Sequence, residues 1–280
     1  MVSYTYTVLS FPGSLSTYAS GINHGVTTSK IEIVGTGGPT GQQGFLAGVS
    51  EKKTVTETYH DLNYPHVSDQ IVPIDINDSG QIVGYYLDSS GVYVGFERSG
   101  GKFTTFVVPF VGAMDTYAIA NNDSGEIVGH WTDSGGVTHG FTLIAGTYTS
   151  FDYPGATYTQ ANDVNSGGEI VGWYVDASGV YHGFLLSGGT FSSTDVPGAV
   201  FTITTAINDS GLIAGVYCTT SECLSTGEGE QGFLLSGGVF TPFAIPGEYS
   251  TFISDITNNG TVLGVYEDVA GLSVSFLATP

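Results

Sequence analysis

Three aspartates occupy the same place in alternate copies of a short repeated stretch. The copies DINDSGQIVGYY, DVNSGGEIVGWY and DITNNGTVLGVY begin with them, whereas ANNDSGEIVGHW and AINDSGLIAGVY begin with alanine. If the copies repeat around an axis, three carboxylates come together there, and like charges cannot all ionise unaided. Carboxylate oxygens are the ligands that Ca²⁺ prefers. The sequence therefore predicts either a Ca²⁺ site in a central channel or carboxylates that accept backbone N–H groups and fasten the units together, at Asp75, Asp163 and Asp255.

Two further residues are candidates for acid–base catalysis. His66 lies in a long connector, YPHVSDQIV, and Asp115 lies in a second connector, VGAMDTY. A carboxylate or an imidazole at a pocket mouth can move protons. Their loose spacing matches no catalytic motif, and the chain has no G-x-S-x-G, H-E-x-x-H, phosphate-loop or EF-hand pattern. An enzyme (a hydrolase, lyase or isomerase) therefore remains the alternative function, with ordinary surface loops as the other interpretation of both residues.

The two cysteines, Cys218 and Cys223, lie in one insertion, CTTSEC. A local disulfide is expected if the protein is exported, because disulfides persist in oxidising compartments. Two free thiols in a loop are the alternative. The spacing also resembles half of a metal site, but no second Cys or His pair accompanies it.

Charge restricts the class of partner. The chain of 280 residues carries 5 Lys and Arg against 26 Asp and Glu, a net charge of −21. Nucleic acid and anionic membrane surfaces would repel such a protein. No apolar run is long enough to span a membrane. The acidity fits a secreted or cell-surface protein, and we expect it to be a monomer without membrane insertion. The start, MVSYTYTVLS, has no signal-peptide pattern, so we expect the chain to be the mature form.

The spacing of a recurrent glycine predicts the architecture. The glycine that ends each IVG-like motif recurs with a period of about 45 residues, and each unit contains four strand-like runs separated by turn residues such as NDSG and DASG. The 42 glycines and many Tyr, Phe, Thr and Val residues also favour an all-β chain. This period is typical of a propeller blade. The glycines number six: Gly35, Gly84, Gly129, Gly172, Gly215 and Gly264.

The two ends of the chain complement each other. The last unit stops at VSFLATP without a fourth strand, while the N-terminal TYTVLSFPG resembles the fourth strand TYTSFDYPG of the third unit. Residues 1–13 are therefore predicted to supply the last strand of the final blade, which closes the ring and removes exposed edges. The predicted fold is one domain, 1–280: a six-bladed β-propeller of four-stranded antiparallel blades.

The blocks IVG, HGF and PGA resemble the HAF repeats, a family of extracellular repeat proteins. The similarity covers nearly the whole chain, although HGF stands here in place of HAF. The resemblance implies export and supplies no activity or catalytic residue. The HGF histidines, His139 and His182, are replaced by Val in other units, which indicates packing or a local hydrogen bond.

Residues at one face of the predicted ring form the candidate binding site. The connectors that enter the innermost strands place aromatic and polar residues around a concave mouth, a combination that suits a neutral polar ligand such as a sugar. The residues differ between units, so one asymmetric site is expected rather than six equal ones. Packing between blades is the alternative for each ring, and a protein-binding scaffold is a third function. The predicted ligand-binding residues are Tyr18, Tyr117, Gln160 and Phe252.

Overall fold

The computed structural model describes residues 3–10, 17–23, 30–37, 43–50, 60–62, 71–221, 223, 229–268 and 271–280. Across these residues the chain is all-β and forms four four-stranded sheets and one eight-stranded sheet. The described part contains no helix of the length and apolarity that a membrane crossing requires.

Each sheet is an antiparallel meander of sequence neighbours, except that β1 joins the last sheet. The strands are β1 (Thr5–Leu9), β2 (Tyr18–Ile22), β3 (Lys30–Gly37), β4 (Gln43–Ser50), β5 (His60–Asp61), β6 (Ile71–Ile76), β7 (Ile82–Leu87), β8 (Tyr93–Ser99), β9 (Lys102–Phe106), β10 (Ala113–Asn121), β11 (Ile127–Asp133), β12 (Thr138–Ile144), β13 (Thr147–Phe151), β14 (Tyr158–Val164), β15 (Ile170–Val175), β16 (Tyr181–Ser187), β17 (Thr190–Ser193), β18 (Phe201–Ile207), β19 (Ile213–Cys218), β20 (Gln231–Ser236), β21 (Val239–Phe243), β22 (Ser250–Ile256), β23 (Val262–Glu267) and β24 (Ser273–Thr279).

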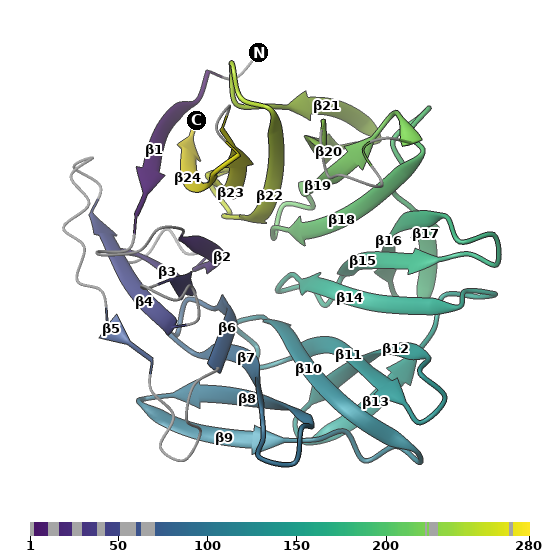
Figure 1. Cartoon of the computed structure of the whole chain (residues 1–280). Coiled ribbons are helices and arrows are strands. Elements are labelled where there is room, and N and C mark those ends of the chain that lie inside the picture. The colour runs from purple at the N-terminus through teal and green to yellow at the C-terminus, as the bar shows by residue number, and fades with distance from the viewer. Residues whose placement is uncertain are drawn as a thin grey trace.

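The sheets are arranged radially, with β2, β6, β10, β14, β18 and β22 nearest the centre (Figure 1). The eight-stranded sheet consists of two meanders, β10–β13 and β14–β17, which a single parallel pair, Thr138 with Tyr158, joins. The first strand of every meander therefore presents one set of alternate side chains toward the centre, and these strands position the candidate site.

The two chain ends meet in one sheet. Strand β1 pairs antiparallel with β24, from Thr5 opposite Thr279 to Leu9 opposite Ser275, where the sequence placed the N-terminal strand. The Ala19 amide of β2 donates to Ser275 Oγ at 2.9 Å, and that hydroxyl donates to the Thr17 carbonyl at 2.6 Å. The first and last sheets of the chain are thus linked by buried hydrogen bonds.

Asparagines in the NDSG-type turns connect successive sheets. The Nδ2 of each donates to the backbone carbonyl of the corresponding residue in the next sheet, while its Oδ1 accepts the N–H groups two and four residues further on. Asparagine suits this position because its amide side chain both donates and accepts; in the last sheet Thr257 takes the equivalent place, and its hydroxyl accepts the Thr261 amide. The donors are Asn77, Asn122, Asn165 and Asn208, at 3.0 to 3.4 Å.

The core of each meander is built around a phenylalanine that is paired with the glycine of the IVG motif; this phenylalanine follows a glycine in five meanders and Ser275 in the last. These six rings are among the largest fully buried side chains of the described residues, and each lies at an equivalent point of its sheet. Their repetition explains why GF recurs through the chain. The rings are Phe45, Phe96, Phe141, Phe184, Phe233 and Phe276.

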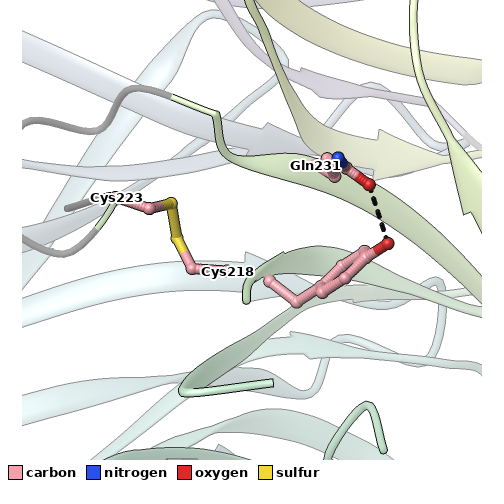
Figure 2. Close-up of a disulfide and its surroundings, with 4 residues drawn as sticks. Cys218, Cys223 and Gln231 are labelled. Atoms are coloured by element: carbon pink, nitrogen blue, oxygen red, sulfur yellow. Dashed lines mark hydrogen bonds between the residues drawn. A yellow bond between two sulfur atoms is a disulfide. The ribbon is translucent and has the colours of Figure 1, made fainter. Parts of the chain in front are cut away.

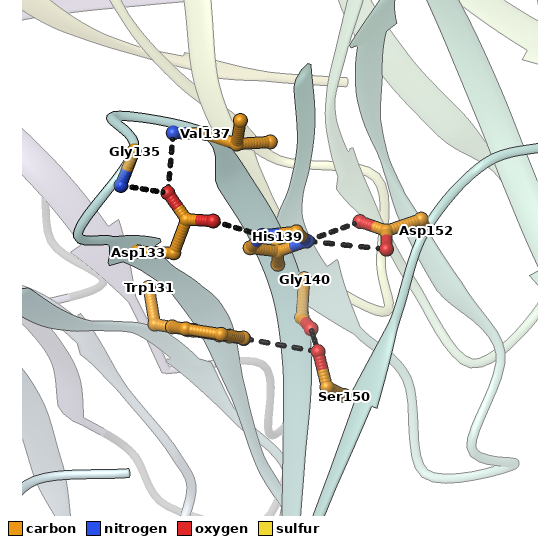
Figure 3. Close-up of polar contacts among 8 residues, drawn as sticks. All are labelled: Trp131, Asp133, Gly135, Val137, His139, Gly140, Ser150 and Asp152. Carbon is orange, nitrogen blue, oxygen red and sulfur yellow. Dashed lines mark hydrogen bonds and ion pairs between the residues drawn. The ribbon is translucent and has the colours of Figure 1, made fainter. Parts of the chain in front are cut away.

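The HGF histidines make local hydrogen bonds, as the sequence indicated. His139 Nδ1 lies 2.9 Å from Asp152 Oδ1, its Nε2 lies 3.7 Å from Asp133 Oδ2, and its ring stacks on Trp131 at 4.5 Å between centroids (Figure 3). His182 repeats the arrangement with Asp195 and Asp176 in the next meander. These clusters join the third strand of each meander to the end of the second strand and to the segment after the fourth, and their histidines do not line the central cavity described below.

Glycine is required at the end of the IVG motif for a steric reason. The inner strand has a bulge between Ala118 and Ala120, and a Cβ on Gly129 would lie 2.0 Å from the Tyr117 carbonyl oxygen. The same close approach recurs at Gly172, where the distance to the Gln160 oxygen is also 2.0 Å. No side chain fits there without moving backbone.

We expect Gly129→Ala to lower the free energy of unfolding by about 2–4 kcal/mol, because the added methyl overpacks a backbone contact. Gly135→Ala is the matched control, since its Cβ meets only the flexible Asp133 carboxylate, at 3.1 Å. Urea unfolding of both variants measures the difference. Equal stability of the two variants would contradict the steric explanation.

Candidate functional site

One cavity of about 540 Å³ lies among the inner strands. The four residues that the sequence predicted as ligand-binding all line it, and each comes from a different strand: β2, β10, β14 and β22. The complete lining is Tyr18, Ser20, Ile74, Asp75, Tyr85, Tyr117, Ile119, Ala120, His130, Gln160, Asn162, Asp163, Trp173, Ile203, Thr205, Phe252, Ser254 and Asp255.

The lining forms two tiers because alternate residues of a strand face the same side. Tyr18, Tyr117, Gln160, Ile203 and Phe252 form the upper tier. The lower tier, two residues further along each strand, is apolar on β6 and β10 and polar on the remaining inner strands. Its members are Ser20, Ile74, Ile119, Asn162, Thr205 and Ser254. The cavity is therefore amphipathic, with an isoleucine corner facing an arc of amide and hydroxyl groups.

Sequence reasoning missed three lining residues on second strands: Tyr85, His130 and Trp173. Each directly follows an IVG glycine and pairs with an inner-strand residue, as Trp173 does with Gln160. The sequence carried a signal for these residues. The position directly after the IVG glycine varies among units, whereas the position after it is aromatic in most of them. Those next residues pack in the core, as Trp131 and Tyr217 do.

The aromatic side chains on the wall hold one another in place. Trp173 stacks against Tyr158 at 4.4 Å and against Tyr181 at 5.2 Å between centroids. Tyr117 stacks on His130 at 4.5 Å. Such contacts fix ring orientation, so the wall presents preorganised ring edges and polar tips to a ligand.

The phenols that line or adjoin the cavity are hydrogen-bond donors without positive charge. Burial raises the pKa of Tyr117 well above its usual range and that of Tyr158 to about 12. Burial is the main cause that raises the pKa of Tyr18. The charge of Glu230 and the nearby Tyr85 raise the pKa of Tyr18 further. These phenols stay protonated at neutral pH. No Lys or Arg lines the cavity among the described residues.

Gln160 belongs to a hydrogen-bonded chain. Its Oε1 accepts from the Tyr158 hydroxyl at 2.7 Å, and its Nε2 donates to Asn162 Oδ1 at 2.8 Å. Asn162 Nδ2 in turn donates to the Thr204 carbonyl at 2.7 Å. The chain orients both amides along one side of the cavity.

The structure shows Asp75, Asp163 and Asp255 in the second of the two roles predicted for them, in which their carboxylates accept backbone amides and fasten neighbouring sheets together. In each, Oδ1 accepts the amide of the following residue at 2.7 Å. Each Oδ2 accepts an amide of the next inner strand, at 2.9, 2.6 and 2.9 Å; the donors are Asn121, Ile207 and Ile22 respectively. The three aspartates also do not bring their ligand atoms within 4.8 Å of one another.

At this position the inner strands carry an aspartate and a small residue in turn. Between β2 and β6 this alternation has a steric reason. A Cβ on Gly21 would lie 2.6 Å from the Asp75 Cα and 2.9 Å from its Oδ1. The small residue therefore leaves room for the aspartate of the neighbouring strand. The alternative interpretation of these aspartates, as backbone acceptors, describes the structure.

Of the two candidates for acid–base catalysis, the described residues include Asp115 alone. Asp115 is not part of the cavity lining, and its Oδ1 accepts the Tyr93 amide at 2.9 Å. His66 lies outside the described residues. The structure therefore gives no support to Asp115 as a catalytic group, because its carboxylate serves the backbone of a neighbouring strand.

Cys218 and Cys223 form a disulfide (Figure 2). Both are buried and pack with Ile203 and Phe252, two residues of the upper tier. The neighbouring Tyr217 hydroxyl donates to Gln231 Oε1 at 2.8 Å (Figure 2). Cys218, Cys223 and Glu230 have ligand atoms within 4.8 Å of one another, but the bridge removes both thiolates. The disulfide braces one wall of the cavity.

His130 predicts a pH dependence of stability. Burial lowers its pKa from 6.5 to about 3, and its Nδ1 is buried without a hydrogen-bond partner among the described residues. The folded protein therefore keeps the imidazole neutral. As the pH falls below 6.5 the unfolded chain binds a proton that the folded chain does not, so stability is lost by up to about 1.4 kcal/mol per pH unit.

Urea unfolding between about pH 6.5 and pH 5, above the main carboxylate range, measures this slope. We expect His130→Phe to have a shallower slope than the parent protein. Identical slopes would show that His130 does not titrate as described.

The fold resembles known propellers at low sequence identity. Putative TolB from Agrobacterium tumefaciens is 10% identical (TM-score 0.61; 94% of this chain, 91% of that one). The fungal Aleuria aurantia lectin, described as a six-bladed β-propeller with a novel fucose recognition mode, is 13% identical (TM-score 0.56; 97% and 93%). Trypanosoma rangeli sialidase is 9% identical (TM-score 0.58; 94% and 54%).

The chain spans 63% of the length of TolB from Acinetobacter baumannii and about half of the sialidase. No protein-family model matches the sequence, and no curated protein matches it either. At these identities the likeness concerns the fold alone. The all-β meanders around a common centre and these structural neighbours together show that the chain has a β-propeller fold.

Proposed function

We propose that the protein is an extracellular carbohydrate-binding propeller with a single site for a neutral glycan in its central cavity. The observation that carries the proposal is the convergence of Tyr18, Tyr117, Gln160 and Phe252 with Trp173 on one cavity of about 540 Å³. A cavity of this size, largely aromatic and apolar with a few oriented polar groups, is typical of small-molecule sites. The fucose-binding lectin among the structural neighbours supports the same ligand class.

The proposal includes a six-bladed ring that forms one domain, 1–280. The pairing of β1 with β24 supports closure by the N-terminal strand. The bonds from Asp255 to Ile22 and from Ser275 to Ala19 and Thr17 also support closure, because they join the last sheet to the first. The eight-stranded sheet counts as two blades, since one residue pair alone joins its halves.

A neutral ligand follows from the charges. The chain has a net charge of −21, the described lining holds no cation, and three aspartates lie at the floor. An anionic sugar would meet no Arg or Lys partner there. Pyranose rings combine hydroxyl groups with C–H faces, which matches the polar arc and the isoleucine corner of the lower tier.

Export is part of the proposal. The Cys218–Cys223 disulfide supports it, because such bridges are rare in reducing compartments. The resemblance of the IVG, HGF and PGA blocks to the HAF repeats supports it as well. We further propose that the protein acts as a monomer.

A hydrolase acting on a glycan is the second candidate. Glu230 lies close enough to Tyr18 for its charge to raise the phenol pKa, and burial raises the pKa of Glu230 itself. A carboxyl of raised pKa beside a sugar site is suited to act as a general acid. Most glycoside hydrolases use a second free carboxylate, whereas the oxygens of Asp75, Asp163 and Asp255 accept backbone amides.

The test is a glycan array followed by titration calorimetry with the sugars that bind. Saturable binding of neutral sugars, with no binding of sialylated or sulfated glycans, supports the proposal. Silence on the array with no shift in melting temperature would count decisively against it. If the protein releases free sugar from a glycan and the Glu230→Gln variant does not, the function is hydrolysis rather than binding.

A further inference from the structure

We propose that the site takes the end of a neutral oligosaccharide, with the terminal ring in the cavity and the following ring on the rim at Tyr181. This inference rests on the proposed function and names the ligand class more closely. It follows from the size of the cavity, from the engaged carboxylates at its acidic end, and from an aromatic ring that extends its wall to the outer surface.

The acidic end of the cavity offers little to a glycan. The carboxylates of Asp75, Asp163 and Asp255 already accept backbone amides of neighbouring inner strands. They therefore have less acceptor capacity left for sugar hydroxyl groups. The terminal ring is accordingly placed against the two tiers, and the rest of the chain extends past the upper tier.

The cavity is larger than one sugar ring. Its volume of about 540 Å³ lies within the roughly 300–1,000 Å³ of sites that bury drug-sized ligands, whereas a hexose has only about a dozen non-hydrogen atoms. A terminal ring leaves space at the upper tier for the glycosidic linkage and part of the next residue. A ligand of one ring would leave part of the cavity wall without ligand contacts.

Tyr181 extends the wall to the outer surface. Its side chain is 37% exposed. Tyr181 stacks on Trp173 of the cavity at 5.2 Å and meets Phe201 edge-on at 6.0 Å, so its ring is held in place. A fixed aromatic ring that is partly exposed, adjoining the cavity wall, offers a surface to the C–H face of a second sugar ring.

An experiment that varies the length of the glycan distinguishes this inference from the proposed function. Glucose, galactose and mannose are titrated alongside their linear oligomers of two to four rings, by calorimetry at constant pH and salt. For the sugar that binds, we expect affinity to rise roughly tenfold between one ring and two or three rings. We expect no further gain beyond that length.

Three variants place the second ring. Tyr181→Ala is expected to reduce the ratio of trisaccharide to monosaccharide affinity several-fold, and Tyr181→Phe to retain it. Tyr6→Ala is the matched control, because Tyr6 is 41% exposed on the outer strand β1 and contacts Phe276 rather than the cavity. Melting curves verify folding, and if Tyr181→Ala does not fold, the length series of the parent protein decides alone.

The outcomes are distinct. Binding of single rings with no gain from longer chains would overturn this inference and leave the proposed function standing. A length gain that Tyr181→Ala does not reduce would overturn the placement on the rim. No binding at any length would overturn the proposed function itself.

Discussion

Replacing Asp255 with alanine is expected to lower the free energy of unfolding by about 3–5 kcal/mol. Its side chain is 5% exposed, and its two oxygens accept the amides of Ile22 and Ile256 at 2.9 and 2.7 Å. Removal of the carboxylate leaves both buried amides unsatisfied and cuts a contact between β2 and β22. Urea unfolding monitored by circular dichroism measures the loss.

Two variants sharpen the Asp255 prediction. Asp255→Asn keeps the shape but replaces one acceptor oxygen by an amide nitrogen, which cannot accept from an N–H, so we expect it also to be destabilised. Asp88→Ala is the control, because Asp88 serves an exposed turn, where its Oδ1 accepts from Ser90 and Val92; its loss should be much smaller. A stable Asp255→Asn protein would contradict the role given to this carboxylate.

Replacing Trp173 with alanine is expected to weaken glycan binding about 100-fold, as for a central aromatic anchor. The indole lines the cavity and is stacked between Tyr158 and Tyr181, so its removal enlarges the site and frees both neighbours. Titration calorimetry with the best-binding sugar measures the change.

The other tryptophan supplies the control for Trp173. The chain has 2 Trp, and Trp131 is 6% exposed, packs in the core and is not part of the cavity lining. In Trp131→Phe, the remaining fluorescence comes from Trp173, and we expect it to change on addition of sugar. In Trp173→Phe we expect no ligand-dependent change. The reverse pattern would place the ligand away from the central cavity.

The repeat pattern predicted the elements because each repeated residue has a local cause. The NDSG turns, the IVG glycines and the GF phenylalanines each correspond to a turn, a bulge contact or a buried ring. Similarity between TYTVLSFPG and TYTSFDYPG located β1 beside β24. The count of six blades and the closure of the ring extend this reasoning and form part of the proposal.

The site was only partly predictable. Spacing alone placed Tyr18, Tyr117, Gln160 and Phe252 at one level, because inner strands start at equivalent points. It did not show that the bulge before Asp163 turns its carboxylate onto the Val164 and Ile207 amides. It also did not show that Trp173 faces the cavity while Tyr174 packs in the core. Bulges change which side a residue faces, and the period of a strand does not reveal them.

The most direct test is a crystal structure of the protein with a saturating neutral oligosaccharide. The account predicts density for a terminal sugar ring in the central cavity, in contact with Trp173, Gln160 and Tyr117, and a second ring against Tyr181. Density between neighbouring sheets at the periphery, or an empty cavity in a crystal saturated with a sugar that binds in solution, would contradict it.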